Sequence, residues 1–589
     1  MIRQILFAST CLSLAACAAS TPTETTPPVA DAPPVAEKPA WTKGGMVAAA
    51  DPRAVAAGMK VLEAGGHAVD AAIAVHSVLS LVEPQSSGIG GGAFMVVYER
   101  ESGDITVVDG RETTPAGSST DLFYDKDGKV MDFLTAWQSG RSVGVPGQVA
   151  LYGKAHELFG KAEWSSLFAD AIELSENGFE VSPRLAEVLA NERLRAIVNL
   201  DDNPDTAPYF YPNGEPLAAG ALRTNPELAE TLTLISEEGA DAFYEGPIAE
   251  AIVKSAGAGE YGSDMTLEDL ANYEVVVREA LCGVALSYKI CSAPPPSSGG
   301  STQNAILGLY ELMIEDLAPD DREGKLRAFV DAQRIGYADR DHYVADADQV
   351  FVPAQDLYDP AYLKVRVEDR FEPGEVPTPG DPGAVLRNEP YIDMWGHDMT
   401  DDKPGTTHIS IVDTYGNAVS MTATVESAFG SSRWAKGFLL NNELTDFSLD
   451  PMKNGKLVAN APESGKRPRS SMSPSLVFDD SGELYMVTGS PGGNSIIAYV
   501  SKTLVGVLDW GMSAQEAVAY PNIIARGESV GVETSADGGE PIGAFLKDLG
   551  YDVKERSGEN SGLHVIVVKE DGLEGGADPR REGVALPVK

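Results

Sequence analysis

Two threonine hydroxyls come together if the chain folds as a hairpin after Thr406. Apolar residues alternate before a turn at residues 413–417 and a strand-forming run follows it, which is typical of two antiparallel strands. Centring the hairpin on Tyr415 places Thr406 opposite Thr424, and directly opposed side chains point to the same face. A bulge in the turn would break this pairing. The pattern therefore predicts a second hydroxyl beside Thr406.

A glycine-rich turn at residues 489–494, GSPGGN, is a second candidate. It follows a predicted strand over 484–488 and precedes a predicted helix over 495–508. A strand, a glycine-rich turn and a helix N-terminus aim free backbone N–H groups at one point. That geometry suits a carboxylate or an oxyanion. A helix-capping turn without a ligand is the alternative.

The segment SSGIGGGA at residues 86–93 has the glycine spacing of a dinucleotide-binding turn. That motif needs a strand before it and a helix after it. Here a predicted helix over 68–82 precedes the glycines, and an apolar strand over 94–98 follows them. We therefore reject a nucleotide site and expect the glycines to let backbone pack closely or to line a pocket.

The elements around these motifs form an α/β pattern. A helix is predicted to start at Asp51-Pro52, a capping residue followed by proline. Residues 142–346 are predicted to be mostly helical, with a hairpin over 282–291 inserted. Residues 371–405 are rich in Pro, Gly and Asp and predict a long, exposed, mobile segment, and strands dominate from 407 onward.

Composition narrows the class of protein. Of 589 residues, 43% are hydrophobic and 23% are charged, as in a globular protein. The net charge of −43 would repel nucleic acid and anionic membrane surfaces, so we expect neither as a partner. The seven histidines are scattered and no HExxH or paired-cysteine zinc pattern occurs, so we expect no metal and no cofactor.

The N-terminus has the features of an export signal. Arg3 precedes a short apolar stretch, and the segment Leu14-Ala15-Ala16-Cys17 resembles the lipobox of bacterial lipoproteins. We interpret residues 1–17 as a signal peptide with lipidation at Cys17, and 18–40 as a Pro-rich tether. The predicted location is the periplasm or cell envelope, with the lipid as the only membrane contact. A plain secretory signal cut near Ala18 is the alternative.

Two cysteines remain in the body of the chain, Cys282 and Cys291. An exported protein meets an oxidising compartment, where such a pair can form a disulfide. Their spacing suits the two arms of a short hairpin, but spacing does not fix the distance between them. A disulfide and two free thiols both remain open.

Six motifs in order resemble the γ-glutamyltransferases, from about Gly45 to the C-terminus. They are Gly88 to Gly92 with Asp109-Gly110-Arg111-Glu112, Pro294 to Gly300, Gly405-Thr406-Thr407-His408, Leu440 to Glu443 with Asp446-Phe447-Ser448, Lys466 to Pro474, and Thr488 to Gly493. Each motif alone is weak, and six in sequence make a chance match very improbable.

The resemblance implies an N-terminal nucleophile hydrolase with a four-layer αββα sandwich. The precursor would cut itself between Gly405 and Thr406, giving a large subunit, 41–405, and a small catalytic subunit, 406–589. The fold would be formed jointly by the two subunits, which stay together as a heterodimer. The activity implied is γ-glutamyl transfer and hydrolysis of glutathione and similar compounds.

This chemistry is coherent on physical grounds. A threonine hydroxyl is a weak nucleophile at neutral pH and needs a nearby base. Cleavage before Thr406 frees an α-amine on the same residue, and such amines titrate near about 7.7–8.0. The uncut precursor lacks this base because its Thr406 nitrogen is an amide. The same hydroxyl can first attack the Gly405 carbonyl, giving an ester that water opens.

The resemblance also implies a site for the zwitterionic γ-glutamyl head. Arg111 would hold the α-carboxylate, helped by Ser470 and Ser471. Glu443 and Asp446 would accept hydrogen bonds from the α-ammonium. The ordinary alternatives are a surface ion pair for Arg111, a turn for Asp446 and a buried hydrogen-bonded loop for the two serines.

Other site residues follow from the same resemblance. Gly492 and Gly493 would donate N–H groups to the oxyanion, and Thr424 would hydrogen-bond the nucleophile. Glu426 belongs to the substrate site, where many members carry Asn. The stretch 448–465 is shorter than in members with a lid and contains no Tyr. We therefore hypothesise an open pocket in which water competes well as acceptor.

Three other functions compete with this interpretation. One is a cephalosporin or glutaryl acylase on the same fold, although a substrate without an α-ammonium would leave Asp446 unpaired. A second is an unprocessed, non-catalytic lipoprotein that binds γ-glutamyl ligands. A structural envelope protein has only the lipobox and tether in its favour.

Overall fold

The computed structural model describes residues 40–368, 371–398, 400, 405–558 and 560–588. Cys17, the signal peptide and nearly all of the tether lie outside the described residues, so those expectations stay predictions. Trp41–Lys589 packs as one unit. The predicted cut after Gly405 therefore falls inside a structural unit and not at a domain boundary.

The first of two large sheets contains the predicted hairpin. All its pairings are antiparallel, and the described strands run in the order β22-β1-β9-β10-β2-β3-β6. Thr406 is the first residue of β9 and pairs with Thr424, the last residue of β10, so the predicted register is confirmed. The strands are β1 Met46–Ala49, β2 Gly92–Tyr98, β3 Ile105–Gly110, β6 Val276–Glu279, β9 Thr406–Val412, β10 Ala418–Thr424 and β22 Val584–Pro587.

The second sheet carries the glycine-rich turn at the end of one strand. Its described strands run in the order β21-β20-β16-β15-β8-β7, again with antiparallel pairing. They are β7 Leu281–Ala285, β8 Tyr288–Ser292, β15 Ser475–Phe478, β16 Leu484–Gly489, β20 His564–Lys569 and β21 Gly572–Ala577. The two cysteines face each other across β7 and β8 and form a disulfide, which decides the open question about them.

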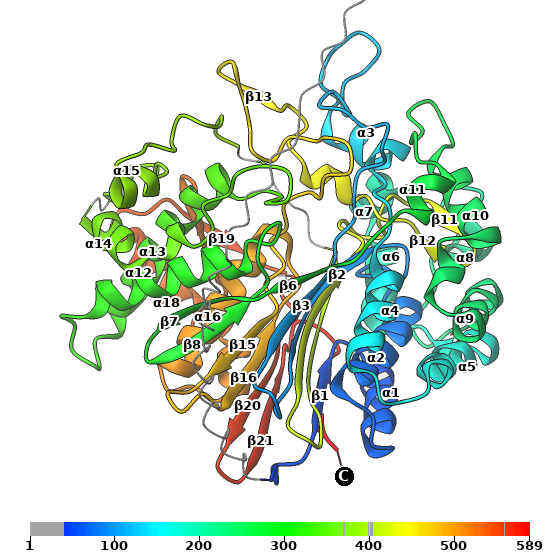
Figure 1. The fold of residues 1–589 in the computed structure, drawn as a ribbon, viewed down its shortest axis with the longest axis horizontal. Coiled ribbons are helices and arrows are strands. Elements are labelled where there is room, and N and C mark those ends of the chain that lie inside the picture. Colours follow the sequence, from blue (N-terminus) through cyan, green and yellow to red (C-terminus); the bar gives the residue numbers. More distant parts are fainter. Residues whose placement is uncertain (1–39, 369–370, 399, 401–404, 559, 589) are drawn as a thin grey trace, which may run out of the picture. The chain divides into compact units, whose positions relative to one another are not determined.

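The two sheets pack on each other through β9, β10, β16 and β20 (Figure 1). Polar groups lie within this layer and are bonded across it. The Ser420 hydroxyl donates to the carbonyl oxygen of Thr488 at 2.9 Å, and the Ser410 hydroxyl donates to that of His564 at 2.9 Å. These bonds fix the hairpin that begins at Thr406 against β16, which leads into the glycine-rich turn, and against its neighbour β20.

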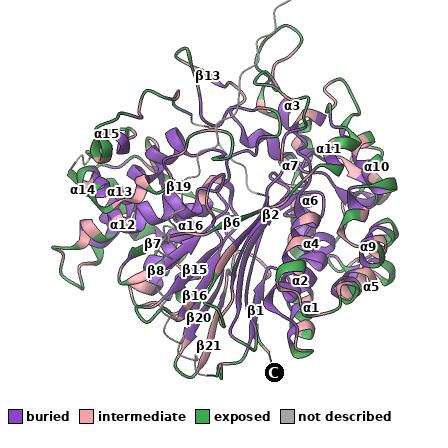
Figure 2. Cartoon of the chain, in the orientation of Figure 1, coloured by how far each residue is buried: buried purple, intermediate pink, exposed green. Residues whose placement is uncertain are grey.

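Helices cover the outer face of each sheet. On the first sheet α1, α2 and α4 contact the strands, and on the second α12, α16 and α17 do so, as the two flanks in Figure 1 show. Most residues of the central strands are buried, and so are nearly all residues of α2 and α16 (Figure 2). These helices are α1 Pro52–Glu63, α2 Ala68–Val82, α4 Gln148–Phe159, α12 Asn304–Ile314, α16 Ile496–Leu508 and α17 Ala514–Ala519.

The remaining helices confirm the mostly helical middle of the chain. They are α3 Phe133–Gln138, α5 Ala169–Asn177, α6 Pro183–Ala190, α7 Glu192–Val198, α8 Ala207–Phe210, α9 Pro226–Glu238, α10 Gly246–Ala256, α11 Leu267–Ala271, α13 Arg322–Tyr343, α14 Pro360–Glu368, α15 Pro382–Arg387 and α18 Gly539–Asp548. Smaller strands are β4 Phe179–Glu180, β5 Leu222–Arg223, β11 Trp434–Ala435, β12 Phe438–Leu439, β13 Met452–Lys453, β14 Lys456–Leu457, β17 Ile523–Arg526, β18 Ser529–Glu533 and β19 Val553–Arg556.

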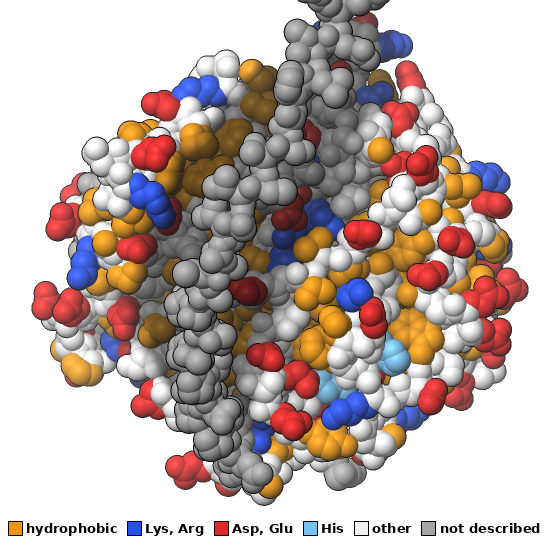
Figure 3. Space-filling view, viewed as in Figure 1, with side chains coloured by type: hydrophobic (Ala, Val, Ile, Leu, Met, Phe, Trp, Pro, Cys, Tyr) orange, Lys and Arg blue, Asp and Glu red, His pale blue; other side chains and the backbone are white. Residues whose placement is uncertain are grey.

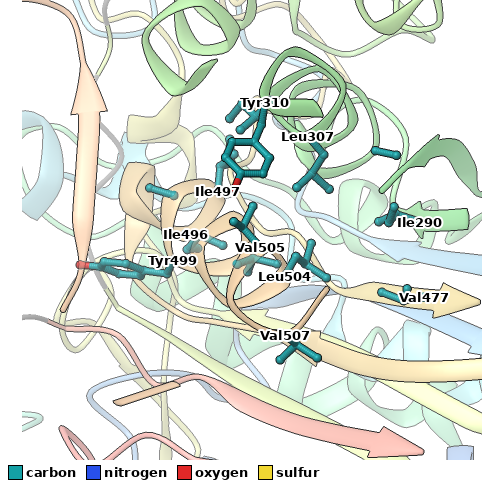
Figure 4. Packing of buried hydrophobic residues seen from close by; sticks show 14 of the residues in the cluster. Ile290, Leu307, Tyr310, Val477, Ile496, Ile497, Tyr499, Leu504, Val505 and Val507 are labelled. Carbon is teal, nitrogen blue, oxygen red and sulfur yellow. The ribbon is translucent and has the colours of Figure 1, made fainter. Parts of the chain in front are cut away.

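Helix α16 is apolar on nearly every side because it is packed between other elements. Leu504 and Val505 belong to the same buried cluster as Leu307 of α12 and the strand residue Val477 (Figure 4). Its one lysine, Lys502, is buried, and the ammonium donates to the carbonyl oxygens of Val518 and Tyr520. Burial lowers the pKa of Lys502 to about 7. This packing fixes the helix whose N-terminus follows the glycine-rich turn.

The prediction of a long, exposed segment over 371–405 is confirmed only in part among its described residues, because the segment also contains the short helix α15 and several buried residues. Asp381 caps α15 and accepts hydrogen bonds from the backbone N–H groups of Tyr391 and Ile392. Tyr391 is buried. One carboxylate thus organises a compact turn that composition alone cannot indicate.

The surface shows no concentration of one charge on the face in Figure 3. Acidic side chains are spread over that face, with basic ones among them. Among the described residues, no helix combines the length and apolar character needed to cross a membrane.

Candidate active site

The Thr406 hydroxyl lies in a short chain of hydrogen bonds. Its Oγ1 is 3.2 Å from Oγ1 of Thr424, which itself donates to the carbonyl oxygen of Gly405 at 2.8 Å. Since Thr424 has one hydroxyl proton, the Thr406 hydroxyl is the donor between the two threonines. The backbone N–H of Glu426 also donates to Thr424 Oγ1, at 2.8 Å. Thr424 therefore positions both the hydroxyl and the carbonyl that it would attack.

One small pocket brings together side chains from five of the six motifs. Its lining includes Thr406 and Thr424 together with every residue predicted to bind the γ-glutamyl head. The described lining residues are Arg111, Thr406, Thr424, Glu426, Glu443, Asp446, Ser470, Ser471, Met472, Gly493 and Ile496. Gly492 is not among them. The lining residues Arg111 and Ile496 are 385 positions apart in the sequence, so only the folding of the chain brings them together.

Arg111 is buried and paired with the two predicted ammonium-binding carboxylates. Its Nη2 donates to Asp446 Oδ2 at 2.6 Å, and its Nη1 donates to Glu443. Nε and Nη2 also donate to the carbonyl oxygens of Pro468 and Arg469. Burial lowers the pKa of Arg111, but the neighbouring carboxylates outweigh burial and hold that pKa above its ordinary value.

This pairing sharpens the predicted roles. A guanidinium has five N–H donors, and four of those on Arg111 are used by described residues. One Nη1 N–H remains to meet a ligand carboxylate. A zwitterionic ligand would then insert its ammonium beside Glu443 and Asp446, so both ends of the ligand would contact one buried ion-pair cluster.

Two buried glutamates in this cluster have raised pKa values. Burial raises the pKa of Glu443 well above its ordinary value, although Arg111 opposes the change. Burial also raises the pKa of Glu112 to about 7, again against the effect of Arg111. As the pH falls, Glu443 at the predicted ammonium position is therefore protonated before an ordinary carboxylate is.

Glu426 adopts a backbone conformation that is unusual for its residue type. Its φ is +76°, in the left-handed region that costs on the order of 1–3 kcal/mol for a residue other than glycine. Its carboxylate accepts from the Ser427 hydroxyl and from the Asn442 side chain, and Asn442 Oδ1 accepts from the Ser427 N–H at 3.0 Å. These contacts hold the carboxylate at the pocket wall.

The early glycines pack against the hairpin, as predicted. A Cβ on Gly91 would overlap the carbonyl oxygen of Thr424, and one on Gly90 would overlap that of Leu439. The Asn441 side chain donates to the carbonyl oxygen of Gly90 at 2.8 Å. Close backbone approach, and not a phosphate, explains why this segment contains so many glycines.

The glycine-rich turn ends in a short 3-10 segment, Gly493–Ser495, before α16 begins at Ile496. Gly492 has φ +138° and Gly493 has φ +56°, and a Cβ on Gly492 would meet the Tyr499 ring. Gly493 lines the pocket and Gly492 lies next to it in the chain. Their role as N–H donors to an oxyanion stays a prediction.

Arg340 on α13 is a residue that sequence reasoning missed. It is fully buried, and its Nη2 donates to the Ser471 hydroxyl at 2.6 Å while its Nε donates to that of Ser298 at 3.1 Å. It therefore links two of the six motifs to the end of the glycine-rich turn, because Nη1 also reaches Asn494 Oδ1 at 3.4 Å. Sequence reasoning missed Arg340 because many charged residues on a helix ordinarily indicate a solvent-exposed face.

His408, two residues after Thr406, is not available as a base. Its ring nitrogens contact the hydroxyls of Thr422 and Ser410 at 2.8 and 3.0 Å. Burial lowers its pKa well below the ordinary value, and a Cβ on Gly489 would overlap its ring. Among the described residues, no three His, Cys, Asp or Glu side chains are grouped to hold a metal ion.

Comparisons with known proteins agree with this arrangement. The family described as Gamma-glutamyltranspeptidase matches residues 54–588. A glutathione hydrolase proenzyme of Bacillus subtilis (strain 168) is 36% identical over 83% of this chain and 81% of its own. That of Escherichia coli (strain K12) is 33% identical over 98% of this chain and 96% of its own.

The fold has neighbours among solved structures. The crystal structure of cephalosporin acylase from Bacillus halodurans matches with a TM-score of 0.78 and 24% identity, covering 95% of this chain and 99% of that one. At this identity the likeness shows the mixed α/β fold alone.

Proposed function

The chain belongs to the gamma-glutamyltranspeptidase family, and on that premise we propose that it is a γ-glutamyltransferase and glutathione hydrolase whose nucleophile is Thr406. The observation that carries this proposal is the pocket in which the Thr406 hydroxyl, the Thr424 hydroxyl and the Arg111 ion-pair cluster meet. Its substrates are γ-glutamyl compounds such as glutathione.

The enzyme begins as a precursor. Thr424 polarises the Gly405 carbonyl, and the Thr406 oxygen attacks its carbon. The bond from that carbon to the Thr406 nitrogen breaks, the hydroxyl proton passes to this nitrogen, and water then opens the resulting ester. The products are a large subunit, 41–405, and a small one, 406–589, which remain together because the cut lies inside one packed unit. The two stacked sheets with their outer helices form a four-layer αββα sandwich to which both subunits contribute strands.

Turnover then uses the freed Thr406. Its α-amine takes the hydroxyl proton as the oxygen attacks the γ-carbonyl carbon of the substrate. The glycine turn stabilises the oxyanion, and the leaving amine takes the proton. Water or an acceptor amine next attacks the γ-glutamyl ester, which regenerates the hydroxyl.

The site supports a γ-glutamyl substrate better than a glutaryl one. A glutaryl group lacks the α-ammonium, so it would leave the buried carboxylates of Glu443 and Asp446 without a ligand cation. Relative rates on γ-glutamyl and glutaryl anilides test this directly. We expect the γ-glutamyl anilide to be cleaved at least 100-fold faster in kcat/KM, and equal rates would favour the acylase.

Export and lipid anchoring complete the proposal. The lipobox at Cys17 supports a mature chain that starts with a lipidated cysteine and reaches the periplasm or envelope. Mass spectrometry of the membrane-extracted protein should find a diacylglyceryl group on Cys17. A mature N-terminus at Ala18 without lipid would instead indicate a plain secretory signal.

A further inference from the structure

A buried ion pair links the chain before the predicted cut to the chain after it. The segment between α15 and β9, here called the arm, includes the described residues 388–398 and 400. Asp398 of the arm pairs with Arg469, whose Nη2 donates to Asp398 Oδ2 at 2.9 Å, and the two side chains are 3% and 1% exposed. The pair would therefore join the large subunit, 41–405, to the small one, 406–589.

Asp398 also shapes the arm itself. Its Oδ1 accepts from the Thr400 backbone N–H at 3.0 Å and from the Thr400 hydroxyl at 2.7 Å, which closes a short turn. The carbonyl oxygen of Thr400 accepts from Arg526 Nη2 at 3.0 Å. One carboxylate thus closes the turn with one oxygen and holds it against Arg469 with the other.

Three arginines gather at this end of the arm. Arg469 Nη1 donates to the carbonyl oxygen of Asp341 at 3.4 Å, and Arg526 Nε donates to Asp341 Oδ2 at 2.9 Å. Arg340 Nη1 donates to Asp341 Oδ1 at 2.9 Å. Burial raises the pKa of Asp341, but these arginines outweigh burial and hold that pKa below its ordinary value. Asp398 supplies a second carboxylate to a cluster that carries three positive charges.

Arg469 also contacts the active site through its backbone. Its carbonyl oxygen accepts from Arg111 Nη2 at 2.8 Å, and the next residue, Ser470, lines the same pocket as Thr406. Arg469 therefore holds the arm with its side chain and contacts the predicted γ-glutamyl site with its backbone. The position of the arm is thus fixed relative to the nucleophile's own pocket.

The peptide bond to be cut is tightly enclosed on its other side. A Cβ on Gly405 would overlap the carbonyl oxygen of Glu426, and the Gly405 carbonyl oxygen accepts from Thr424 at 2.8 Å. Asp398 anchors the chain seven residues before Gly405. Attack by a hydroxyl of the same chain needs the reacting atoms about 3–3.5 Å apart, so a small shift of the arm slows the reaction.

We propose that Asp398 and Arg469 are positioning residues for maturation, because their pair sets the arm of the uncut precursor so that the Gly405 carbonyl meets the Thr406 hydroxyl. Gly405 and Thr406 are joined in this structure, so the contacts are those of the precursor. In the step served, the bond from the Gly405 carbon to Thr406 Oγ1 forms, the bond to the Thr406 nitrogen breaks, and the hydroxyl proton passes to that nitrogen. The assignment rests on the proposed function.

The first test compares two aspartates of the arm that differ in burial. Asp393 pairs with Lys456 at 2.7 Å, but its side chain is 89% exposed, whereas that of Asp398 is 3% exposed. We expect Asp398→Asn to slow the appearance of the two fragments at least tenfold, since the arm loses its buried charged contact. Asp393→Asn should mature at the unaltered rate, because an exposed pair stabilises little. Denaturing gels of samples taken over time after synthesis measure both rates.

A double variant separates positioning from stability. Asp398→Asn alone leaves the buried Arg469 charge uncompensated, so it should also lower the melting temperature, measured in the Thr406→Ala background where every chain stays uncut. Adding Arg469→Met removes that charge and keeps the backbone carbonyl that Arg111 contacts. We expect the double variant to regain the melting temperature but still mature at least tenfold slower than the unaltered chain. Recovery of maturation together with the melting temperature would indicate a merely structural pair and overturn the proposal.

Turnover gives the third readout. Asp398 is not among the described residues that line the active-site pocket, so cut molecules of Asp398→Asn should hydrolyse a γ-glutamyl anilide with kcat and KM within twofold of the unaltered enzyme. A tenfold loss of kcat per cut molecule would indicate a general disturbance and contradict the assignment. Equal maturation rates for Asp398→Asn, Asp393→Asn and the unaltered chain overturn the assignment alone, whereas an unaltered chain that is never cut overturns the proposed function.

Discussion

Two pockets adjoin the Gly405–Thr406 bond and differ in how their polar groups are satisfied. The first is the pocket that Thr406 and Arg111 line, and the second has a volume of about 350 Å³ and is lined by Gly405. In the first, Arg111 is buried and ion-paired with both Glu443 and Asp446 before any ligand arrives, and Glu443 Oε2 is left without a described hydrogen-bond partner. In the second, the Gln85 amide and Arg581 Nε have no described partner, and the remaining lining is largely apolar. The difference indicates a fixed, specific site for the γ-glutamyl group next to a pocket whose lining admits more varied groups, because a paired cluster admits few ligands.

Thr406 lies at the junction of the two pockets, so the comparison depends first on its role as the nucleophile. Thr406→Ala should abolish both maturation and turnover, since it removes the hydroxyl used in each. Thr406→Ser should keep a measurable fraction of both. Gel analysis of the purified chain and donor hydrolysis check this, and full activity of the alanine variant would exclude Thr406 as nucleophile.

The paired character of the first pocket is tested at Arg111. Arg111→Lys keeps a cation but loses the planar fork that contacts two carboxylates and two carbonyl oxygens. We expect the donor KM to rise at least 30-fold, while maturation continues. Arg111→Ala should also lower the melting temperature, because it leaves buried carboxylates uncompensated. An unchanged donor KM in both variants would remove Arg111 from the site.

Thr424 should affect maturation more mildly. Thr424→Val keeps the shape but removes the hydrogen bond to the Gly405 carbonyl oxygen. Losing one such bond, about 1–1.5 kcal/mol, slows cleavage about tenfold. The rate of fragment appearance after expression measures this, and Thr422→Val on the same strand, whose hydroxyl contacts His408, is the control.

The last prediction concerns the acid stability of the fold and leaves the chemistry of both pockets unchanged. Burial lowers the pKa of His564 to about 4 from an ordinary 6.5. The native state then binds fewer protons than the unfolded state between these values, so stability present above pH 6.5 is lost as pH falls toward 4. His564→Gln should reduce the loss in free energy of unfolding between pH 6.5 and pH 4 by an amount on the order of 3 kcal/mol, which denaturant unfolding at the two pH values measures. His76 and His408, whose pKa values are also lowered by burial, keep their own contributions.

Much of the fold was predictable where local patterns decide it. The hairpin register that pairs Thr406 with Thr424 followed from strand alternation around one turn, and α2 has the predicted bounds. The compact turn organised by Asp381 was not predictable, since one carboxylate bonding distant backbone N–H groups leaves no pattern in composition.

The two pockets were unequally predictable for a related reason. The first is built from short motifs that each carry chemistry-bearing residues, so resemblance located them. Arg340 escaped because its burial depends on how α13 packs. The second pocket joins Gln85, α3, α7 and Arg581, which share no motif and meet only in the folded chain.

The most direct measurement of the central claim is intact mass with N-terminal sequencing of the purified mature protein. Two fragments, with the smaller beginning Thr-Thr-His at Thr406, are the predicted result. They would establish maturation and place the free α-amine on the nucleophile. A single uncut chain that remains folded would contradict the account, because the catalytic amine would never form, and a non-catalytic γ-glutamyl-binding protein would then be the better explanation.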